Sequence, residues 1–117
     1  DLFGVFTDRD NDKFRDIYVF SQRPLDALLF EPNMPKLTLV VKAKECQLAI
    51  NDKAYVAASQ NRHEATYKEL PLLQGWNKVS IKIGERDKNE FSGNFRCDNR
   101  NEFLSSLKVM FVNPEVK

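Results

Sequence analysis

Residues 76–83 read Trp-Asn-Lys-Val-Ser-Ile-Lys-Ile, and apolar and polar side chains alternate along most of this segment. Successive side chains of a β-strand point to opposite faces, so Val79, Ile81 and Ile83 fall on one face and the intervening Lys and Ser on the other. One face is therefore expected in a core and the other in water, as in antiparallel sheets.

The same alternation recurs in short segments that are separated by polar turns. Asn51 and Asp52 stand between two of these segments and tolerate the positive φ of a tight hairpin turn. No stretch shows a sustained helical period, although residues 27–30 are compatible with a strand or a helical turn. The pattern predicts an all-β, antiparallel β-sandwich of about eight or nine short strands. The further segments are 2–6, 17–20, 36–43, 46–50, 54–56, 66–70, 91–95 and 107–111.

Composition is typical of one globular domain and excludes several classes of partner. Of 117 residues, 42% are hydrophobic and 30% charged, and 18 basic residues almost balance 17 acidic ones to give a net charge of +1. No clustered basic tract is present, which argues against nucleic-acid binding. No apolar run approaches the ~20 residues that span a bilayer, so no membrane insertion is expected. Residues 1–117 are interpreted as a single module, excised from a larger protein.

Two stretches carry a more specific pattern than periodicity. Residues 46–57, Cys-Gln-Leu-Ala-Ile-Asn-Asp-Lys-Ala-Tyr-Val-Ala, are followed after a polar loop by residues 70–83, Leu-Pro-Leu-Leu-Gln-Gly-Trp-Asn-Lys-Val-Ser-Ile-Lys-Ile. This arrangement resembles the C-terminal half of the galactose-binding-like jelly-roll domains that are appended to many bacterial polysaccharide-degrading enzymes. The resemblance covers about forty residues, and Asn51-Asp52-Lys53 stands where the family usually has Asn-Gly-Lys.

The resemblance implies a jelly-roll, non-catalytic accessory module, most often carbohydrate-binding, of a secreted polysaccharide-active protein in an extracellular or periplasmic setting. The alternative is a structural or protein-interaction domain that packs against neighbouring domains of its parent chain without a small ligand. An enzyme is not expected. His63 is the only histidine available to a catalytic triad, and the sequence contains no nucleophile-elbow motif.

A carbohydrate site needs aromatic rings for stacking on sugar C–H faces and polar groups for the hydroxyls. Tyr55 and Tyr67 flank a polar loop that contains Asn61, Arg62 and His63, and these five residues are the predicted carbohydrate site. An ordinary exposed loop is the alternative interpretation. The polar loop 98–102 is an equal candidate by composition, whereas Trp76, at the start of a predicted strand, is expected in the core.

An Asp-rich segment near the start of the chain could bind calcium. Asp8, Asp10, Asp12 and Asp16 are closely spaced, and Ca²⁺ takes six to eight oxygen ligands. The spacing follows part of the helix-loop calcium pattern, but Lys13 occupies the place of its turn glycine. A structural calcium ion is therefore one hypothesis, and a solvated turn with local ion pairs is the other.

Cys46 and Cys97 are the two cysteines, and their spacing matches no zinc motif. They could form one disulfide in a secreted domain or remain two separate, half-buried thiols.

Overall fold

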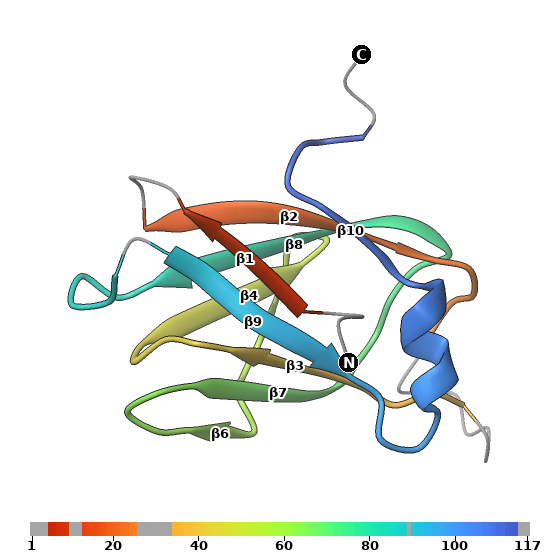
Figure 1. Cartoon of the computed structure of the whole chain (residues 1–117), viewed down its shortest axis with the longest axis horizontal. Helices are drawn as coiled ribbons and strands as arrows, with labels where there is room; N and C mark the ends of the chain where they lie inside the picture. The colour runs from red at the N-terminus through yellow and green to blue at the C-terminus, as the bar shows by residue number, and fades with distance from the viewer. Residues whose placement is uncertain (1–4, 10–12, 26–33, 89, 115–117) are drawn as a thin grey trace.

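The computed structural model describes residues 5–9, 13–25, 34–88 and 90–114, and these form two antiparallel sheets packed face to face (Figure 1). The predicted β-sandwich is confirmed. The first sheet has the strand order β1–β9–β3–β7–β6 and the second sheet the order β10–β2–β8–β4–β5. The elements are β1 (Val5–Arg9), β2 (Phe14–Ser21), β3 (Leu37–Val41), β4 (Cys46–Ile50), β5 (Lys53–Tyr55), β6 (Ser59–Gln60), β7 (Ala65–Leu70), β8 (Gly75–Ile83), β9 (Glu90–Arg96), the 3₁₀ helix η1 (Asn101–Ser106) and β10 (Lys108–Met110).

The strand order is that of a jelly roll with one extra strand at an edge of each sheet. β1 pairs with β9, β2 with β8, β3 with β7 and β4 with β5, so the chain pairs like a long hairpin rolled into two sheets. The short strands β6 and β10 extend the edges beside β7 and β2. Because the partners come from distant parts of the chain, the roll brings remote loops together at each end of the sandwich.

The core lies between the two sheets and consists of the side chains that the apolar–polar alternation predicts to face inward. In β8, Val79 and Ile81 have no exposed surface and Ile83 has 3%, whereas Lys82 on the opposite face is exposed. From the first sheet, Leu39, Phe91 and similar side chains pack against them. Burial of such apolar area is the main term that stabilises the sandwich.

Most predicted segments are strands in the structure, with shifted ends. β2 begins at Phe14, so the polar segment before Ile17 is partly strand. β1 extends to Arg9, beyond the predicted segment 2–6, and residues 2–4 lie outside the described residues. The polar loop predicted between Tyr55 and Tyr67 contains the two-residue strand β6, which raises the number of strands to ten among the described residues. Residues 27–30 lie outside the described residues.

Two turns depend on unusual backbone conformations. Asn51 and Asp52 have φ of 51° and 69°, as the hairpin prediction requires, and they join β4 to β5. Gly75 has φ of +96°, where a side chain would be strained, and it begins β8 directly before Trp76. The segment Gly-Trp-Asn therefore starts with a residue that the backbone geometry demands.

Cys46 and Cys97 are free thiols in the structure. Cys46 begins β4 in the second sheet, and Cys97 is buried just after β9 of the first sheet. Burial raises the pKa of both thiols, which keeps them protonated at neutral pH.

The part of the chain that the structure describes contains no helix with the length and apolar character of a transmembrane span.

Candidate functional site

The predicted carbohydrate loop is an ordered turn between β6 and β7. The side-chain oxygen of Asn61 accepts hydrogen bonds from the backbone N–H groups of His63 and Glu64, at 2.7 and 2.9 Å. Gln60 Nε2 donates to the backbone oxygens of Ala43, Asn61 and Glu64. Asn61 thus shapes the loop, while Arg62 and His63 extend from it as exposed side chains.

The structure does not bring the two predicted tyrosines to this loop. The Tyr67 ring is 1% exposed in the core, and its hydroxyl donates to the Cys46 backbone oxygen at 3.2 Å, so it offers no surface to a sugar. This corrects the expectation for Tyr67, whose period-2 position on β7 faces inward. Tyr55 is half-buried and lines a different, apolar hollow beside Leu72 and Leu73.

The predicted calcium residues are divided between strands of different sheets. Asp8 belongs to β1 of the first sheet and Asp16 to β2 of the second, while Asp10 and Asp12 lie outside the described residues. Asp16 Oδ1 accepts a hydrogen bond from the Ser80 hydroxyl at 2.5 Å. Within the described ranges, no three His, Cys, Asp or Glu side chains gather as a metal site would require. Calcium remains a prediction.

The alternative polar loop 98–102 uses its side chains within the fold. Asn99 accepts from the Lys36 backbone N–H and donates to the Met34 backbone oxygen, at 3.0 and 2.9 Å. Arg100 pairs with Glu102 at 2.5 Å, and this contact lowers the pKa of the Glu102 carboxyl. Loop 98–102 has the polar composition of a binding site, but the hydrogen bonds of Asn99 hold the segment that leads into β3.

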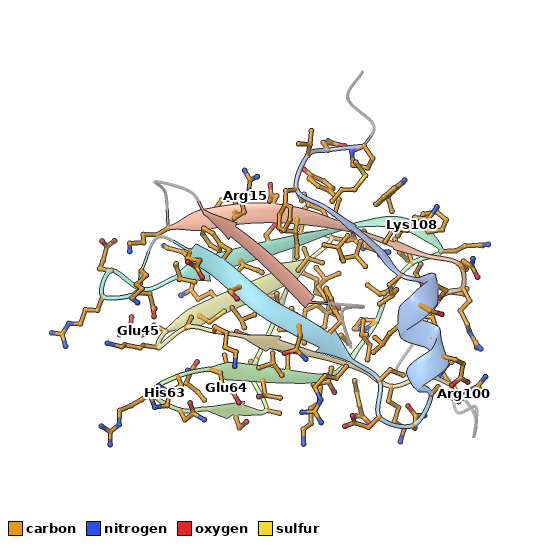
Figure 2. The ribbon with its side chains drawn as sticks, viewed as in Figure 1. Arg15, Glu45, His63, Glu64, Arg100 and Lys108 are labelled. Atoms are coloured by element: carbon orange, nitrogen blue, oxygen red, sulfur yellow. The ribbon has the colours of Figure 1, made fainter. Side chains whose placement is uncertain are left out.

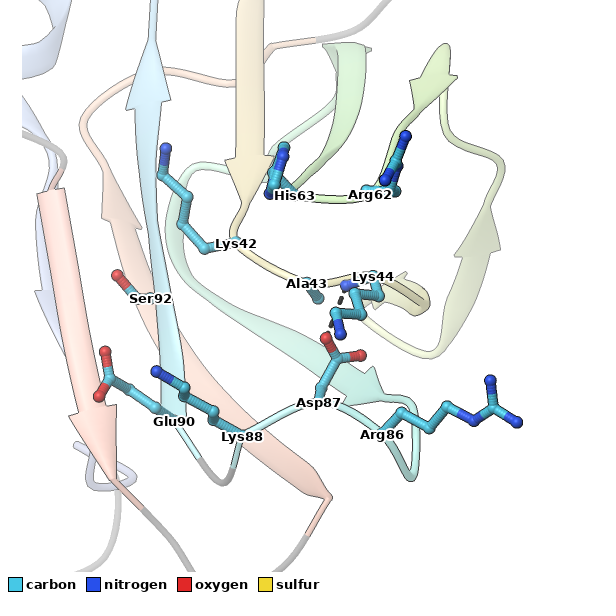
Figure 3. A pocket seen from close by; sticks show the side chains of 10 residues that line it. All are labelled: Lys42, Ala43, Lys44, Arg62, His63, Arg86, Asp87, Lys88, Glu90 and Ser92. Atoms are coloured by element: carbon cyan, nitrogen blue, oxygen red, sulfur yellow. Dashed lines mark hydrogen bonds between the residues drawn. The ribbon is translucent and has the colours of Figure 1, made fainter.

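A hollow of about 440 Å³ opens where the β3–β4, β6–β7 and β8–β9 connections meet (Figure 3). Figure 3 shows Arg62 and His63 on one side of it and Asp87 on the other. Five basic side chains and two carboxylates contribute to its wall. The lining residues are Lys42, Ala43, Lys44, Arg62, His63, Arg86, Asp87, Lys88, Glu90 and Ser92.

Asp87 holds two of these connections together. Its carboxylate accepts hydrogen bonds from the backbone N–H groups of Lys44, Glu45 and Gly84, at 2.6, 3.1 and 3.0 Å. Lys13 Nζ donates to the backbone oxygen of the same residue. Both Asp87 oxygens therefore accept hydrogen bonds from the backbone of the surrounding connections.

A second candidate surface is the outer face of the second sheet, where Trp76 lies. Trp76 is half-buried and absent from the core, so the expectation of a core tryptophan is wrong. Its neighbour Asn77 takes the inward position instead. Trp76 pairs across the sheet with Phe20, and the two rings meet edge to face with centroids 5.4 Å apart. The Lys108 ammonium lies 5.5 Å from the centroid of the Phe20 ring.

Beside these rings is a hollow of about 290 Å³ with polar and aromatic walls. Tyr18 faces it from β2, directly across from Lys78, whose ammonium pairs with Asp52 at 2.9 Å. This contact raises the pKa of Lys78, which keeps its charge. The lining residues are Tyr18, Asn51, Asp52, Trp76, Asn77, Lys78, Asn113 and Pro114.

Asn77 fixes the turns that frame this hollow and has no exposed surface. Its Oδ1 accepts from Leu73 N and Asn51 Nδ2, both at 2.8 Å. Its Nδ2 donates to the backbone oxygens of Leu73, Gly75 and Val19, at 2.9, 3.1 and 3.3 Å. Asn51 in turn accepts from the Lys78 backbone N–H at 3.0 Å, so the β4–β5 turn is tied to β8.

The two candidate surfaces lie at opposite ends of the sandwich. In Figure 2, His63, Glu64 and Glu45 are at one end and Lys108 is toward the other. Trp76 begins β8 and the β8–β9 connection follows its end, so a nine-residue strand separates them by roughly 25 Å.

Sequence reasoning found Arg62 and His63 but missed Tyr18 and Trp76 as surface residues. The available signal was the alternation of β8, because Val79 and Ile81 point inward and Trp76 therefore belongs to the face of Lys78. The pairing of Tyr18 and Phe20 with β8 had no sequence signal, since it is set by long-range register.

Comparison with known proteins adds no relative: no family model, curated protein or solved structure matches this chain.

Proposed function

We propose that this chain is a non-catalytic accessory β-sandwich that binds carbohydrate through the hollow beside Trp76. The observation that carries the proposal is that Tyr18 and Trp76 line one hollow with the amide of Asn51 and the Asp52–Lys78 pair. Aromatic rings stack on the C–H faces of a sugar, and amide, carboxylate and ammonium groups bond to its hydroxyls. Most known small-ligand sites combine apolar walls with a few fixed polar groups in this way.

The polar groups of this hollow are held before any ligand arrives. Asn51 is fixed by Asn77 and by the Lys78 backbone, and the Lys78 ammonium pairs with Asp52 at the surface. Ordering such side chains at the moment of binding would cost free energy, so a preformed site favours affinity. The resemblance of residues 46–83 to galactose-binding-like jelly-roll domains supports the same ligand class. It also supports a secreted, extracellular or periplasmic parent protein.

The test is calorimetric titration of the domain with a panel of neutral oligosaccharides. We expect saturable binding that weakens about tenfold or more in Trp76→Ala and in Tyr18→Ala, because central aromatic side chains dominate most binding sites. Trp76→Phe keeps a ring and should retain part of the affinity. Phe14→Ala is the matched control, since Phe14 is an exposed ring on the same strand face, 52% accessible, and does not line the hollow.

Two results would contradict this assignment. Absence of binding across the panel would remove carbohydrate as the ligand of this hollow. An equal loss in Phe14→Ala would show that the aromatic side chains act through folding or nonspecific adhesion, and thermal unfolding of each variant would separate these two causes.

A second function, an interaction domain that packs against a neighbouring domain, is favoured by an apolar hollow of about 330 Å³ near β5. Pro24, Leu25, Tyr55, Pro71 and Leu73 contribute to it, and Leu73 is 63% exposed. Apolar surface of this kind is characteristic of interaction sites. Leu73→Lys would abolish such an interface and leave sugar binding intact.

A further inference from the structure

The hollow at the junction of the β3–β4, β6–β7 and β8–β9 connections has a charge pattern that the Trp76 site does not share. Its wall contains Lys42, Lys44, Arg62, Arg86 and Lys88, with Asp87 and Glu90 as the only acids lining it among the described residues. All five basic side chains are exposed at the surface. Cations gathered around a concavity raise the local concentration of anions.

The acidic groups nearby are committed to other partners. Asp87 has both carboxylate oxygens bonded to backbone N–H groups, and Glu64 pairs with Lys42 at 3.3 Å. Among the described residues, no hydrogen bond or ion pair involves the side chains of Lys44, Arg62 or Arg86. Figure 3 shows the Arg86 side chain extending away from the hollow, with Lys44 beside Asp87 and Arg62 on the opposite side.

The position of these cations is set by the fold rather than by chance exposure. Asn61 fixes the turn that carries Arg62, and Gln60 ties that turn to the Ala43 backbone oxygen at 3.1 Å. The backbone N–H of Lys44 donates a hydrogen bond of 2.6 Å to Asp87 Oδ1, which fixes the backbone of Lys44. The β3–β4 connection therefore holds Lys44, and the β6–β7 connection holds Arg62, at the wall of the same hollow. The volume of about 440 Å³ is within the range of known ligand pockets.

We propose that this hollow binds the carboxylate or sulfate groups of an acidic polysaccharide. Arg62 suits such groups because its planar guanidinium can donate two parallel hydrogen bonds to one carboxylate or sulfate. The choice of a polysaccharide rests on the proposed function of the Trp76 hollow. A nucleic acid fits less well, because no Phe, Tyr or Trp among the described residues lines this hollow to stack on a base and because the charge of the whole chain is only +1.

The experiment compares binding of polygalacturonate, dextran sulfate, unmodified dextran and single-stranded DNA, at low and at physiological salt. The test variant is Lys44→Gln/Arg62→Gln, and the control Lys68→Gln/Arg96→Gln removes the same charge from exposed positions on β7 and β9 outside the hollow. We expect the unmutated domain to bind at least one acidic polysaccharide, more weakly at high salt. The test variant should lose about tenfold in affinity or more, and the control about twofold or less.

Three results would overturn the proposal: no binding of either acidic polymer, an equal loss in the test and control variants, or equally tight binding of DNA. The Trp76→Ala variant separates this proposal from the proposed function. Retained binding of acidic polymer in Trp76→Ala, together with lost binding of neutral sugar, supports both sites. If the unmutated domain binds the acidic polymer but no neutral sugar, the Trp76 site fails and the cationic hollow stands.

Discussion

At each end of the sandwich one polar side chain, Asn77 or Asp87, holds neighbouring turns together through hydrogen bonds. The two side chains differ in charge and in the groups to which they bond. At the aromatic end, Asn77 is fully buried and bonds to both N–H and C=O groups of surrounding turns. At the cationic end, Asp87 is half-buried and bonds only to N–H groups through its carboxylate. An amide is a donor and an acceptor without charge, whereas a carboxylate is an acceptor that resists burial.

The same difference is the basis for the two ligand classes that we propose for the two ends. A neutral buried amide leaves the surface above it free for aromatic rings, which favour uncharged sugar faces. A partly solvated carboxylate draws backbone donors and tolerates lysine and arginine around it, which favours anionic groups. Both ends are parts of one jelly roll, so their stability and their binding can be changed separately.

The largest expected effect is at the aromatic end, in Asn77→Ala. Removal of the amide leaves several buried backbone groups and Asn51 without their partner, which should lower the free energy of unfolding by about 3 kcal/mol. Urea denaturation of the variant measures this loss, with Gln74→Ala as an exposed control that should change stability by about 0.5 kcal/mol or less. A loss for Asn77→Ala as small as that of the control would show that the amide does not fasten this end.

At the cationic end, Asp87→Ala should have a smaller effect on stability and a separate effect on binding. Loss of three backbone hydrogen bonds at a half-buried site should cost about 1 to 2 kcal/mol, since water can replace part of them. Denaturation and titration with polygalacturonate measure the two effects. We expect weaker binding of acidic polymer although a negative charge has been removed, because the connection that carries Lys44 loses its anchor. Stronger binding would indicate that charge alone governs this end.

The smallest expected effect is at the bond between the sheets, in Tyr67→Phe. The Tyr67 hydroxyl joins β7 of the first sheet to the Cys46 carbonyl of the second, and its loss should cost about 1 kcal/mol at pH 7. Burial, followed by the contact with Cys46, raises the pKa of Tyr67 well above its usual value of about 10.

The raised pKa gives this prediction a pH signature. The unfolded state loses the tyrosine proton near pH 10 while the folded state retains it, so the contribution is complete below pH 10 and declines as the pH rises above that value. Unfolding of the protein that retains Tyr67 should show a steeper decline between pH 8 and pH 11 than that of Tyr67→Phe. Burial raises the pKa of the Cys97 thiol in both proteins, so Cys97 cancels in the comparison. The Cys46 thiol contacts Tyr67, so both proteins carry Cys46→Ala to remove its titration. Parallel pH profiles would contradict a raised Tyr67 pKa.

The candidate surfaces were partly predictable because different signals define their residues. Arg62 and His63 could be found from the composition of a loop, since a polar run between strands is exposed in most folds. The sequence does not show that Tyr67 is buried while Tyr55 is half-exposed, because this depends on which face of β7 points toward the core. A shift of one residue in the register of β7 would turn Tyr67 to the outer face. The prediction of a core Trp76 is wrong because it rests on the position of Trp76 at the start of a buried strand, whereas the alternation of β8 places the ring on the outer face.

Local sequence is enough to predict the strand periodicity of residues 76–83 and the positive-φ turn at Asn51 and Asp52, and from these an all-β sandwich. These features are local, because side-chain alternation and turn conformation depend on a few consecutive residues. In contrast, the position of Tyr18 opposite Lys78 is visible only in the folded molecule, as is the hollow where the connections of Lys44 and Arg62 meet. Such neighbours are separated by long stretches of chain, and they meet only when two sheets pair and pack in a single register.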